Sequence, residues 1–252
     1  KPVKGISDKN NYGYSNLDQQ DIENQVVTFK VESEISPNAK LNSITRYSDI
    51  QQKATVSAPQ GTFCLADGTS PTALTNTNQT GYKNCNVTSG STTITVPKGS
   101  YYISGPRGYY RDTHNKQFAN DTNINVQFKT GVVDHALVAG VGFSREDYAI
   151  TTAGYLYNSN GSSAGSSITN PLYMDVYNPD NFWLGPTNFR KTGVAEGYLN
   201  VYSAYLFDTL KFGEQWLLNL GVRNDYTDGQ YRSDTISTTN AAVTRGQNYK
   251  QS

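Results

Sequence analysis

The segment WLLNLGVRNDYTDGQYRS, residues 216–233, begins as a β-strand and then continues as polar sequence with no conventional stop. On an extended chain its side chains separate into a mostly apolar and a mostly polar side: Trp216, Leu218, Leu220 and Val222 against Leu217, Asn219, Gly221 and Arg223. Such alternation is ordinary for a half-buried strand. However, Arg223, Asp225 and Asp228 continue the polar side beyond the point where a strand of a soluble domain would turn. The apolar side could therefore meet either a protein core or a lipid bilayer.

The composition indicates strands and turns rather than helices. Only 36% of the 252 residues are hydrophobic, which is low for a globular core, whereas Tyr (19) and Gly (22) are abundant. The formal net charge is zero, so bulk electrostatics favour neither nucleic acid nor an anionic surface. No run of about 18 apolar residues is present, which excludes a membrane-spanning helix. Because the chain starts Lys1-Pro2-Val3, we expect a processed protein or a piece of a longer one.

Period-two alternation predicts six strands. In two of them the alternation is clear along the whole segment, since Ile124, Val126 and Phe128 alternate with polar residues, as do Val27, Phe29 and Val31. The predicted strands cover residues 24–35, 40–55, 121–130, 135–150, 197–209 and 215–232.

The connections between these strands alternate in length. The stretches SPNA (36–39), GVVD (131–134) and LKFGE (210–214) are short turn sequences that contain Gly or Pro. Between these hairpins lie long connections, from about 57 to 120 and from about 151 to 196, and residues 1–20 and 233–252 resemble parts of two more. Loops of this length without clear secondary structure are uncommon in compact soluble domains.

This alternation of short and long connections is typical of an outer-membrane β-barrel, in which short turns face the periplasm and long loops face outward. Aromatic residues near strand ends fit the girdles of such a barrel: Phe143, Tyr148, Phe207, Phe212 and Trp216. A soluble Greek-key sandwich is the alternative, but its strands are usually shorter and its loops rarely divide so consistently by length. We therefore favour an all-β, antiparallel transmembrane barrel segment of about six strands.

Two cysteines, Cys64 and Cys85, lie in one polar stretch rich in Gly, Thr and Asn. We favour a disulfide, because a cross-link removes freedom from a loop with little hydrophobic content, and this implies an oxidising compartment. Two unrelated free thiols are the alternative. A metal site is not expected, because no His or further Cys lies nearby to complete four ligands.

The hairpin sequences resemble those of TonB-dependent outer-membrane receptors. The resemblance is carried by three stretches: VYSAYLFDTLKFGEQWLLNLGVRNDY (201–226), RDTHNKQFANDTNINVQFKTGVVDHALVAGVGFSREDY (111–148) and FKVESEISPNAKLNSITRYS (29–48). Their details are most similar to the catecholate siderophore receptor branch. The resemblance implies a barrel of about 22 strands closed by a plug. We interpret residues 1–252 as one partial barrel domain, without the plug domain and the remaining strands.

Two aromatic-rich loops are the candidate binding regions. A ferric catecholate is a flat-faced aromatic anion, which aromatic rings and guanidinium groups match through stacking, cation–π contact and charge. We expect the ligand-binding residues to lie in the stretches 100–113 and 170–191 and to be Tyr101, Tyr102, Arg107, Tyr109, Tyr110, Arg111, Tyr173, Tyr177, Trp183 and Arg190. Two other interpretations are that the rings only pack the loops, or that they stack bases of single-stranded nucleic acid. The zero net charge argues against the second.

No catalytic constellation is found in the sequence. His114 and His135 are isolated, and His135 opens a predicted strand as a turn or rim residue. The stretch SREDY (144–148) holds charged residues that we expect to face the lumen at a strand end. We therefore expect neither an enzyme nor a metal site.

The sequence favours a transport function. We expect a monomeric receptor in the bacterial outer membrane, with its long loops extracellular, that binds a ferric siderophore as its cargo, needs no resident cofactor and contacts outer-membrane lipid but no nucleic acid. By the resemblance, TonB would energise import through an N-terminal region outside this chain. The alternative is a soluble or surface-anchored all-β module that binds carbohydrate or protein.

Overall fold

The computed structural model describes residues 5–57, 61–73, 80–103 and 108–251. These residues form fourteen β-strands and no helix. Accordingly, none of them belongs to a helix long and apolar enough to cross a membrane.

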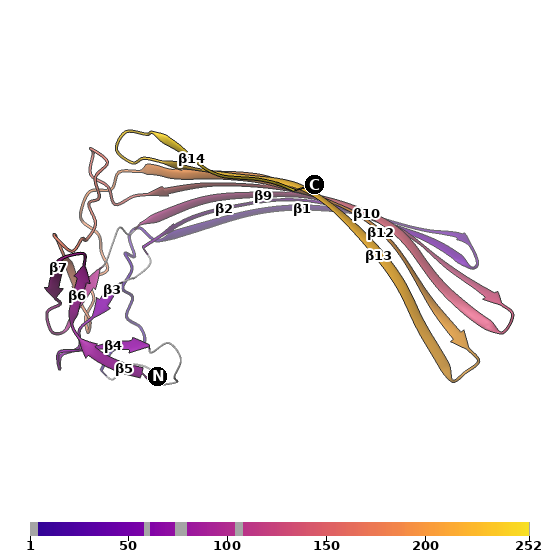
Figure 1. Cartoon of the computed structure of the whole chain (residues 1–252), viewed down its shortest axis with the longest axis horizontal. Helices are drawn as coiled ribbons and strands as arrows, with labels where there is room; N and C mark the ends of the chain where they lie inside the picture. The colour runs from indigo at the N-terminus through magenta and orange to yellow at the C-terminus, as the bar shows by residue number, and fades with distance from the viewer. Residues whose placement is uncertain (1–4, 58–60, 74–79, 104–107, 252) are drawn as a thin grey trace.

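Seven long strands form one antiparallel sheet that arches along the length of the molecule (Figure 1). Each strand pairs with its neighbour in an order that follows the chain, with the intervening short strands lying outside the sheet. In spatial order the strands are β1 (Gln19–Ser36), β2 (Ala39–Val56), β9 (Tyr109–Thr130), β10 (Val133–Gly154), β12 (Arg190–Phe212), β13 (Trp216–Ile236) and β14 (Val243–Gln251).

Short turns join the strands at one end of the sheet, as the sequence predicts. β1 and β2 are joined after Ser36, β9 and β10 through Gly131, and β12 and β13 through Gly213. Both glycines have a φ of +62°, a conformation that side chains other than hydrogen disfavour. All three turns lie at the end of the sheet remote from the small strands (Figure 1).

The strands are longer than the alternation predicted, and there is one more of them. β9 starts twelve residues before the predicted start at Asp121, and β13 continues to Ile236, paired with β12 as far as Thr235. β14 occupies part of the region 233–252 that we expected to be a long loop, so that expectation is wrong. The alternation missed these parts because both faces of the strands are polar there, while backbone pairing with the neighbours continues.

The pairing register sorts the side chains of the sheet onto two faces, because directly opposed residues share a face. Phe143 pairs with Tyr202 on the face that also carries Leu220, and we call this the apolar face. Asn123 and Arg223 belong to the opposite face, which we call the polar face. The interior of an outer-membrane barrel is polar and its lipid-facing surface apolar, so the two faces match the two sides of a barrel wall.

Aromatic rings form a continuous row across the apolar face. Tyr47 pairs with Phe118, whose ring lies 6.2 Å from that of Phe143. The Phe143 ring lies 5.0 Å from Tyr202, and Tyr202 lies 6.2 Å from Tyr226. We call these five residues the upper girdle.

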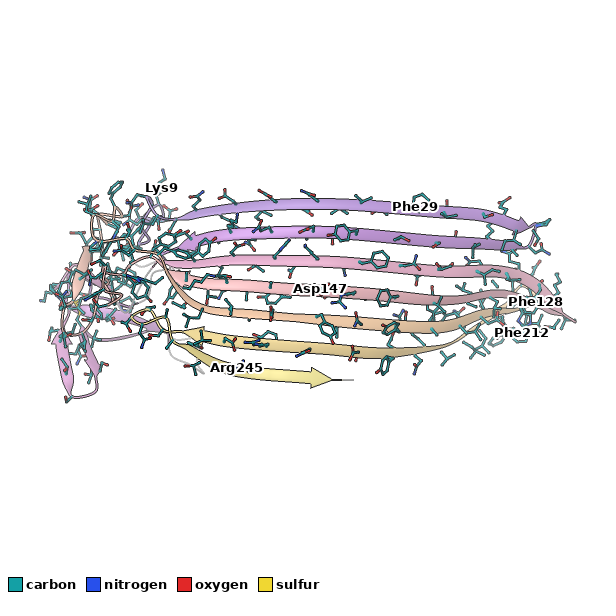
Figure 2. The ribbon with its side chains drawn as sticks, turned by 90° about the horizontal axis from the view of Figure 1, so that it is seen from above. Lys9, Phe29, Phe128, Asp147, Phe212 and Arg245 are labelled. Carbon is teal, nitrogen blue, oxygen red and sulfur yellow. A yellow bond between two sulfur atoms is a disulfide. The ribbon has the colours of Figure 1, made fainter. Side chains whose placement is uncertain are left out.

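A second group of aromatic residues lies near the turns on the same face. Phe128 and Phe212 are at the turn end of the sheet (Figure 2), and each lies ten residues along its strand from a ring of the upper girdle. Trp216 and Tyr226 in β13 have the same separation. Ten residues of a strand tilted by about 40° rise about 26 Å, close to the roughly 25 Å apolar band of outer-membrane barrels.

The strand period of two overturns the placement of five residues made from the sequence. Tyr148 and Phe207 lie on the polar face, an odd number of residues from Phe143 and Phe212, so neither belongs to a girdle. The alternation also places Asp228, and both Arg145 and Asp147 of the SREDY stretch, on the apolar face beyond the upper girdle. Arg145 and Asp147 therefore do not face the polar side of the sheet, where we had expected them.

No second layer of described residues covers the apolar face. Leu218 is 47% exposed, Leu220 55% and Val141 59%, and Leu137 is half-buried. The buried apolar clusters of the described chain contain none of these residues. The sheet is therefore a single wall, as a barrel requires and a sandwich does not.

On the polar face, two aromatic rings lie flat across glycines of the neighbouring strand. A Cβ atom added to Gly140 would collide with the Tyr205 ring, and one added to Gly221 would collide with Phe207. The Tyr205 hydroxyl donates to the Asp121 carboxylate at 2.9 Å. Because glycine has no side chain, the two rings can pack directly against the backbone of the neighbouring strand.

The long connections at the other end of the sheet form a compact cap, defined here as residues 5–18, 61–103 and 155–189 within the described parts. It lies on the concave side of the arch (Figure 1). Its strands form a three-stranded sheet and two hairpins: β3 (Gly61–Phe63), β8 (Ser100–Ile103) and β11 (Leu172–Asp175), then β4 (Thr69–Ala73) with β5 (Thr80–Asn84), and β6 (Asn86–Ser89) with β7 (Thr92–Thr95). We had expected these connections to lack secondary structure, and that expectation is wrong.

The cap has its own apolar cores. The larger core draws from all three connections and consists of Tyr14, Leu65, Tyr101, Ile103, Leu156, Met174 and Val176. The smaller core surrounds a disulfide between Cys64 and Cys85, which confirms the predicted bond. Burial in these cores offsets the cost of ordering such long connections.

A charged side chain introduced at the level of the apolar band is expected to destabilise the receptor more on the apolar face than on the polar face. Leu220→Arg lies midway between the girdles on the apolar face and should lower the free energy of unfolding by about 2 to 4 kcal/mol in a bilayer. Asn219→Arg, one residue away on the polar face, should have a much smaller effect. Urea unfolding of the full receptor in vesicles measures both, and equal losses would contradict the assignment of the faces.

Loss of the disulfide is expected to loosen the cap but not the sheet. The bond joins residues 21 apart, for which loop-closure entropy corresponds to about 3 kcal/mol. The paired change Cys64→Ser and Cys85→Ser should therefore speed proteolysis within the cap of the folded receptor. Cleavage at the wild-type rate would show that the apolar cores alone hold this region.

Candidate ligand-binding site

A pocket of about 550 Å³ lies at the end of the sheet that carries the cap. Its lining residues come from five neighbouring strands, and most of them lie on the polar face. They are Gln20 of β1, Gln52, Ala54 and Val56 of β2, Tyr109, Tyr110, Arg111 and Thr113 of β9, Thr152 and Ala153 of β10, and Thr192 of β12. The pocket thus brings together three of the ten ligand-binding residues predicted from the sequence.

Arg111 and Tyr109 give the pocket its chemical character. Both side chains are exposed and alternate on β9, so they point to the same face. Among the described residues no carboxylate forms an ion pair with Arg111, so its guanidinium retains its donors for an anionic ligand. An aromatic face beside an unpaired guanidinium suits a flat aromatic anion.

Amide and hydroxyl groups complete the lining. Gln20 and Gln52 come from β1 and β2, which pair with each other beside β9. The Thr192 hydroxyl donates to that of Thr152 at 3.1 Å, beside a register shift that follows Thr152. These groups can donate and accept hydrogen bonds without adding charge, so Arg111 dominates the electrostatics of the pocket.

Tyr110 is held in place by other aromatic rings. Its ring meets Phe189 at 5.4 Å and Tyr155 at 6.0 Å, both in edge-to-face geometry. Phe189 and Tyr155 also contact each other at 5.5 Å. This cluster ties β9 to the connection between β10 and β12, so the two ends of that connection position the pocket edge by packing.

Tyr157 stands next to the pocket and has a perturbed hydroxyl. Burial raises the pKa of the Tyr157 hydroxyl, and the neighbouring Tyr109 raises that pKa further. The Tyr157 ring lies so close to Gly154 that an added Cβ would be 2.6 Å from its Cε2 atom. Tyr157 therefore stays a neutral donor well above neutral pH and covers the end of β10.

Two of the predicted ligand-binding residues are core residues of the cap. The Tyr101 ring is fully buried and stacks on Phe63 at 4.3 Å. Tyr102 is buried beside the disulfide. In this conformation neither ring is presented to a ligand. Arg107 lies outside the described residues.

Of the other four predicted residues, three belong to the cap and the fourth begins β12, and none of them lines the pocket. Tyr173 and Tyr177 are partly exposed, and the Tyr177 hydroxyl accepts from the backbone of the 61–73 segment. Trp183 packs against Tyr14 at 5.1 Å. Arg190 donates to the carbonyl of Ser159 and begins β12.

Several pocket residues could not be found from the sequence. Gln20, Gln52 and Thr152 are far apart along the chain and have no distinctive neighbours, so only the strand register brings them to Arg111. Tyr157 lies in the connection 155–189 but outside the aromatic-rich stretch that drew attention. No described group of three or more His, Cys, Asp or Glu residues is arranged to hold a metal ion.

The fold defines a class: a wall segment of a partial, antiparallel β-barrel, whose structural neighbours are the plugged barrels of TonB-dependent receptors. The structure superposes on the Escherichia coli ferric-catecholate import receptor Fiu in its closed form, with a TM-score of 0.59 and 22% identity over 100% of this chain and 32% of Fiu. It also superposes on the siderophore receptor PiuA of Acinetobacter baumannii, with a TM-score of 0.63 and 18% identity over 99% of this chain and 31% of PiuA.

Sequence comparison leads to the same group of proteins. The chain is 27% identical over 232 residues to the catecholate siderophore receptor Fiu of Escherichia coli, covering 92% of this chain and 25% of Fiu. It is 26% identical over 237 residues to the probable TonB-dependent receptor BfrD of Bordetella pertussis, covering 88% of this chain and 26% of BfrD. No family model matches the chain. The resemblance expected from the hairpins is confirmed, and the chain spans about a quarter of the length of these relatives.

Truncating a pocket tyrosine and a core tyrosine should have different effects. Tyr101→Ala empties a buried site and should destabilise the cap by about 3 to 5 kcal/mol. Tyr109→Ala removes an exposed ring and should leave cap stability nearly unchanged. Limited proteolysis of the full receptor measures cap stability, and equal protection of the two variants would contradict the division between core and pocket.

Proposed function

We propose that the chain is part of an outer-membrane receptor that binds a ferric catecholate siderophore for import. The observation that carries the proposal is the pocket in which Arg111, unpaired among the described residues, lies beside Tyr109 at the capped end of a single-layered barrel wall. The names of the similar proteins, a catecholate siderophore receptor and a ferric-catecholate import receptor, support the same ligand class.

The proposed mechanism is capture and transfer without covalent chemistry. The relatives are named as transport receptors rather than enzymes, and the ferric siderophore is cargo, not a resident cofactor. Binding energy at the pocket would come from guanidinium charge, ring stacking and hydrogen bonds. Energy for passage through the barrel would reach the receptor from TonB, through parts outside this chain.

The proposed location is the outer membrane, with the cap extracellular and the receptor acting as a monomer. The exposed apolar face and the two girdles support a lipid environment at the wall. A soluble carbohydrate- or protein-binding module is less well supported, because such a module would need a second layer over Leu218 and Leu220. If the full protein remained folded and monomeric without detergent, the membrane location would be wrong.

Replacing the pocket guanidinium should weaken ligand binding. Arg111→Ala in the full receptor is expected to raise the Kd for a labelled ferric catecholate about tenfold or more, as expected for loss of a charged hydrogen-bonding partner. The same change together with Arg107→Ala tests the second predicted cation. Intrinsic fluorescence quenching by the ferric complex gives the affinity.

A matched control tests whether the loss of affinity requires a guanidinium in the pocket or any guanidinium on the polar face. Arg46→Ala removes a guanidinium from the same polar face, nearer to the turn end of β2. It should leave the Kd within about twofold of wild type, since surface changes away from a site have small effects. If the Arg111→Ala and wild-type receptors bound the ferric catecholate with equal affinity, this pocket would not be the binding site.

A further inference from the structure

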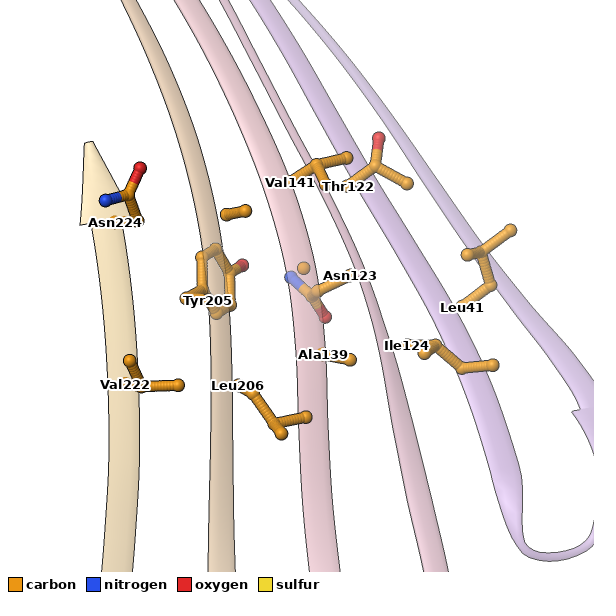
Figure 3. Close-up of a pocket in the computed structure, with 12 residues that line it drawn as sticks. Leu41, Thr122, Asn123, Ile124, Ala139, Val141, Tyr205, Leu206, Val222 and Asn224 are labelled. Carbon is orange, nitrogen blue, oxygen red and sulfur yellow. The ribbon is translucent and has the colours of Figure 1, made fainter. Parts of the chain in front are cut away.

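Every carboxylate on the polar face of the described long strands has a partner within the wall. Asp121 accepts hydrogen bonds from Tyr205 at 2.9 Å and from Asn123 at 3.1 Å, and Figure 3 shows the side chains of both donors. The Gln117 amide donates to Glu146 at 2.9 Å. The remaining carboxylates form ion pairs, namely Glu32 with Lys30, Glu34 with Lys40, Asp134 with Lys129 and Asp225 with Arg223. The acidic groups of this face are therefore already engaged.

Three exposed cations on the same face have neither a hydrogen-bond nor an ion-pair partner among the described residues. Arg111 lines the ligand pocket at the capped end, Arg46 lies between the other two along the wall, and Lys211 lines a separate pocket at the turn end. Because Arg111 belongs to the pocket described above, Lys211 is the cation whose pocket has no assigned role.

The Lys211 pocket has a volume of about 470 Å³ and lies at the inner end of the polar face. Lys211 precedes Phe212, which Figure 2 places at the turn end of the sheet. Lys211 is in register with Lys129, and the 18 residues from Arg111 to Lys129 along β9 rise about 45 Å in a strand tilted by about 40°. The pocket lining includes Asn38, Gln127, Lys129, Thr209, Lys211 and Leu217. The two pockets thus lie at opposite ends of one face.

Hydrogen-bond donors without a described partner share this pocket. The side-chain amides of Asn38 and Gln127 donate to no described group, and both side chains are exposed. The Lys129 ammonium is 2.9 Å from Asp134, which leaves further N–H donors of that ammonium available. The Lys211 ammonium retains all three of its donors within the described structure. The pocket therefore suits a ligand that is negatively charged and has several acceptor oxygens.

Leu217 adds an apolar surface to these donors. Its side chain lies on the polar face and is 66% exposed, although its neighbours on that face are polar. It is paired directly with Lys211 across β12 and β13, so the apolar surface and the ammonium lie side by side. A small inorganic anion gains nothing from such a surface, whereas the ring of an aromatic anion packs against it.

We propose that the Lys211 pocket is a second binding site for the ferric catecholate, which the cargo occupies at the periplasmic mouth before it leaves the barrel. The inference rests on the proposed function and adds a place of release to it. The pocket repeats the chemistry of the capture pocket, a free cation beside neutral amides and an uncharged surface, on the same face of the wall. A leucine in place of tyrosine rings contacts the cargo more weakly, so the cargo is held less tightly there, as release requires.

The test separates capture from transfer in cells that express the full receptor. Radioactive iron in a ferric catecholate reports the Kd in cells without TonB and the uptake rate per receptor in cells with TonB. Lys211→Ala should lower the uptake rate at saturating ligand about tenfold, as expected for loss of a charged hydrogen-bonding partner, and leave the Kd within about twofold of wild type. An uptake rate equal to that of wild type would overturn the proposal.

The matched control removes a cation that is already paired. Lys40 lies on the same face near the turn end, where it forms an ion pair with Glu34 at 2.8 Å. Lys40→Ala changes the net charge equally and should leave uptake unchanged, whereas Lys211→Arg keeps the charge and should restore most of the uptake rate. If Lys40→Ala slowed uptake as much as Lys211→Ala does, the general charge of the lumen and not the pocket would govern transfer, and the proposal would be wrong.

A second variant tests the apolar part of the pocket. Leu217→Asn removes the apolar surface without changing the charge, and it should slow uptake about threefold or more because the cargo rings lose a partner for burial. The Kd of capture should stay within about twofold of wild type. An unchanged uptake rate would overturn the assignment of the pocket to an aromatic anion.

Two further results keep this inference apart from its alternatives. If the pocket held a carboxylate of another part of the receptor, Lys211→Ala would loosen that contact and sensitise the cells to a bulky antibiotic such as vancomycin. Sensitivity above wild type would therefore overturn the proposal, and wild-type sensitivity supports it. A wild-type receptor that binds no ferric catecholate would overturn the proposed function itself. Wild-type binding with equal uptake by Lys211→Ala would overturn only the release site.

Discussion

The rest of the structure depends on pairing of the backbone across the sheet. Inside hydrocarbon, an unpaired amide or carbonyl costs several kcal/mol, so a wall must keep its strands paired along their whole length. β9, β10 and β12 are paired with neighbours on both sides in this way. Pairing fixes the register, and the register in turn decides which side chains reach the membrane and which reach the pocket.

The membrane-spanning parts of the strands could be predicted from the sequence because two environments alternate there. Between the girdles, one face is apolar and the other polar, so period-two alternation finds β1, β10 and β13. Above the upper girdle both faces are polar, and the signal disappears although the strands continue. Residues 109–117 of β9 and all of β14 lie beyond that limit, which is why the alternation predicts loop there.

The candidate site was only partly accessible from the sequence for a related reason. Tyr109 and Arg111 share one strand and a face by their spacing alone, so the aromatic and cationic pattern found them. Tyr101 has the same composition around it but lies in the core of the cap, and no local pattern separates a ring that packs from one that is exposed. Gln20 and Thr152 join Arg111 through two different strand pairings, which are long-range facts.

The larger core of the cap packs together connections that are far apart in the sequence and could otherwise vary independently of one another. Tyr14, Leu65, Tyr101 and Met174 come from three segments of the chain, yet all four are buried in one core. An insertion or deletion in any one of these stretches therefore disturbs the others. We conclude that diversification of this outer surface must proceed by exchange of exposed side chains, with the lengths of the contributing segments kept nearly constant together.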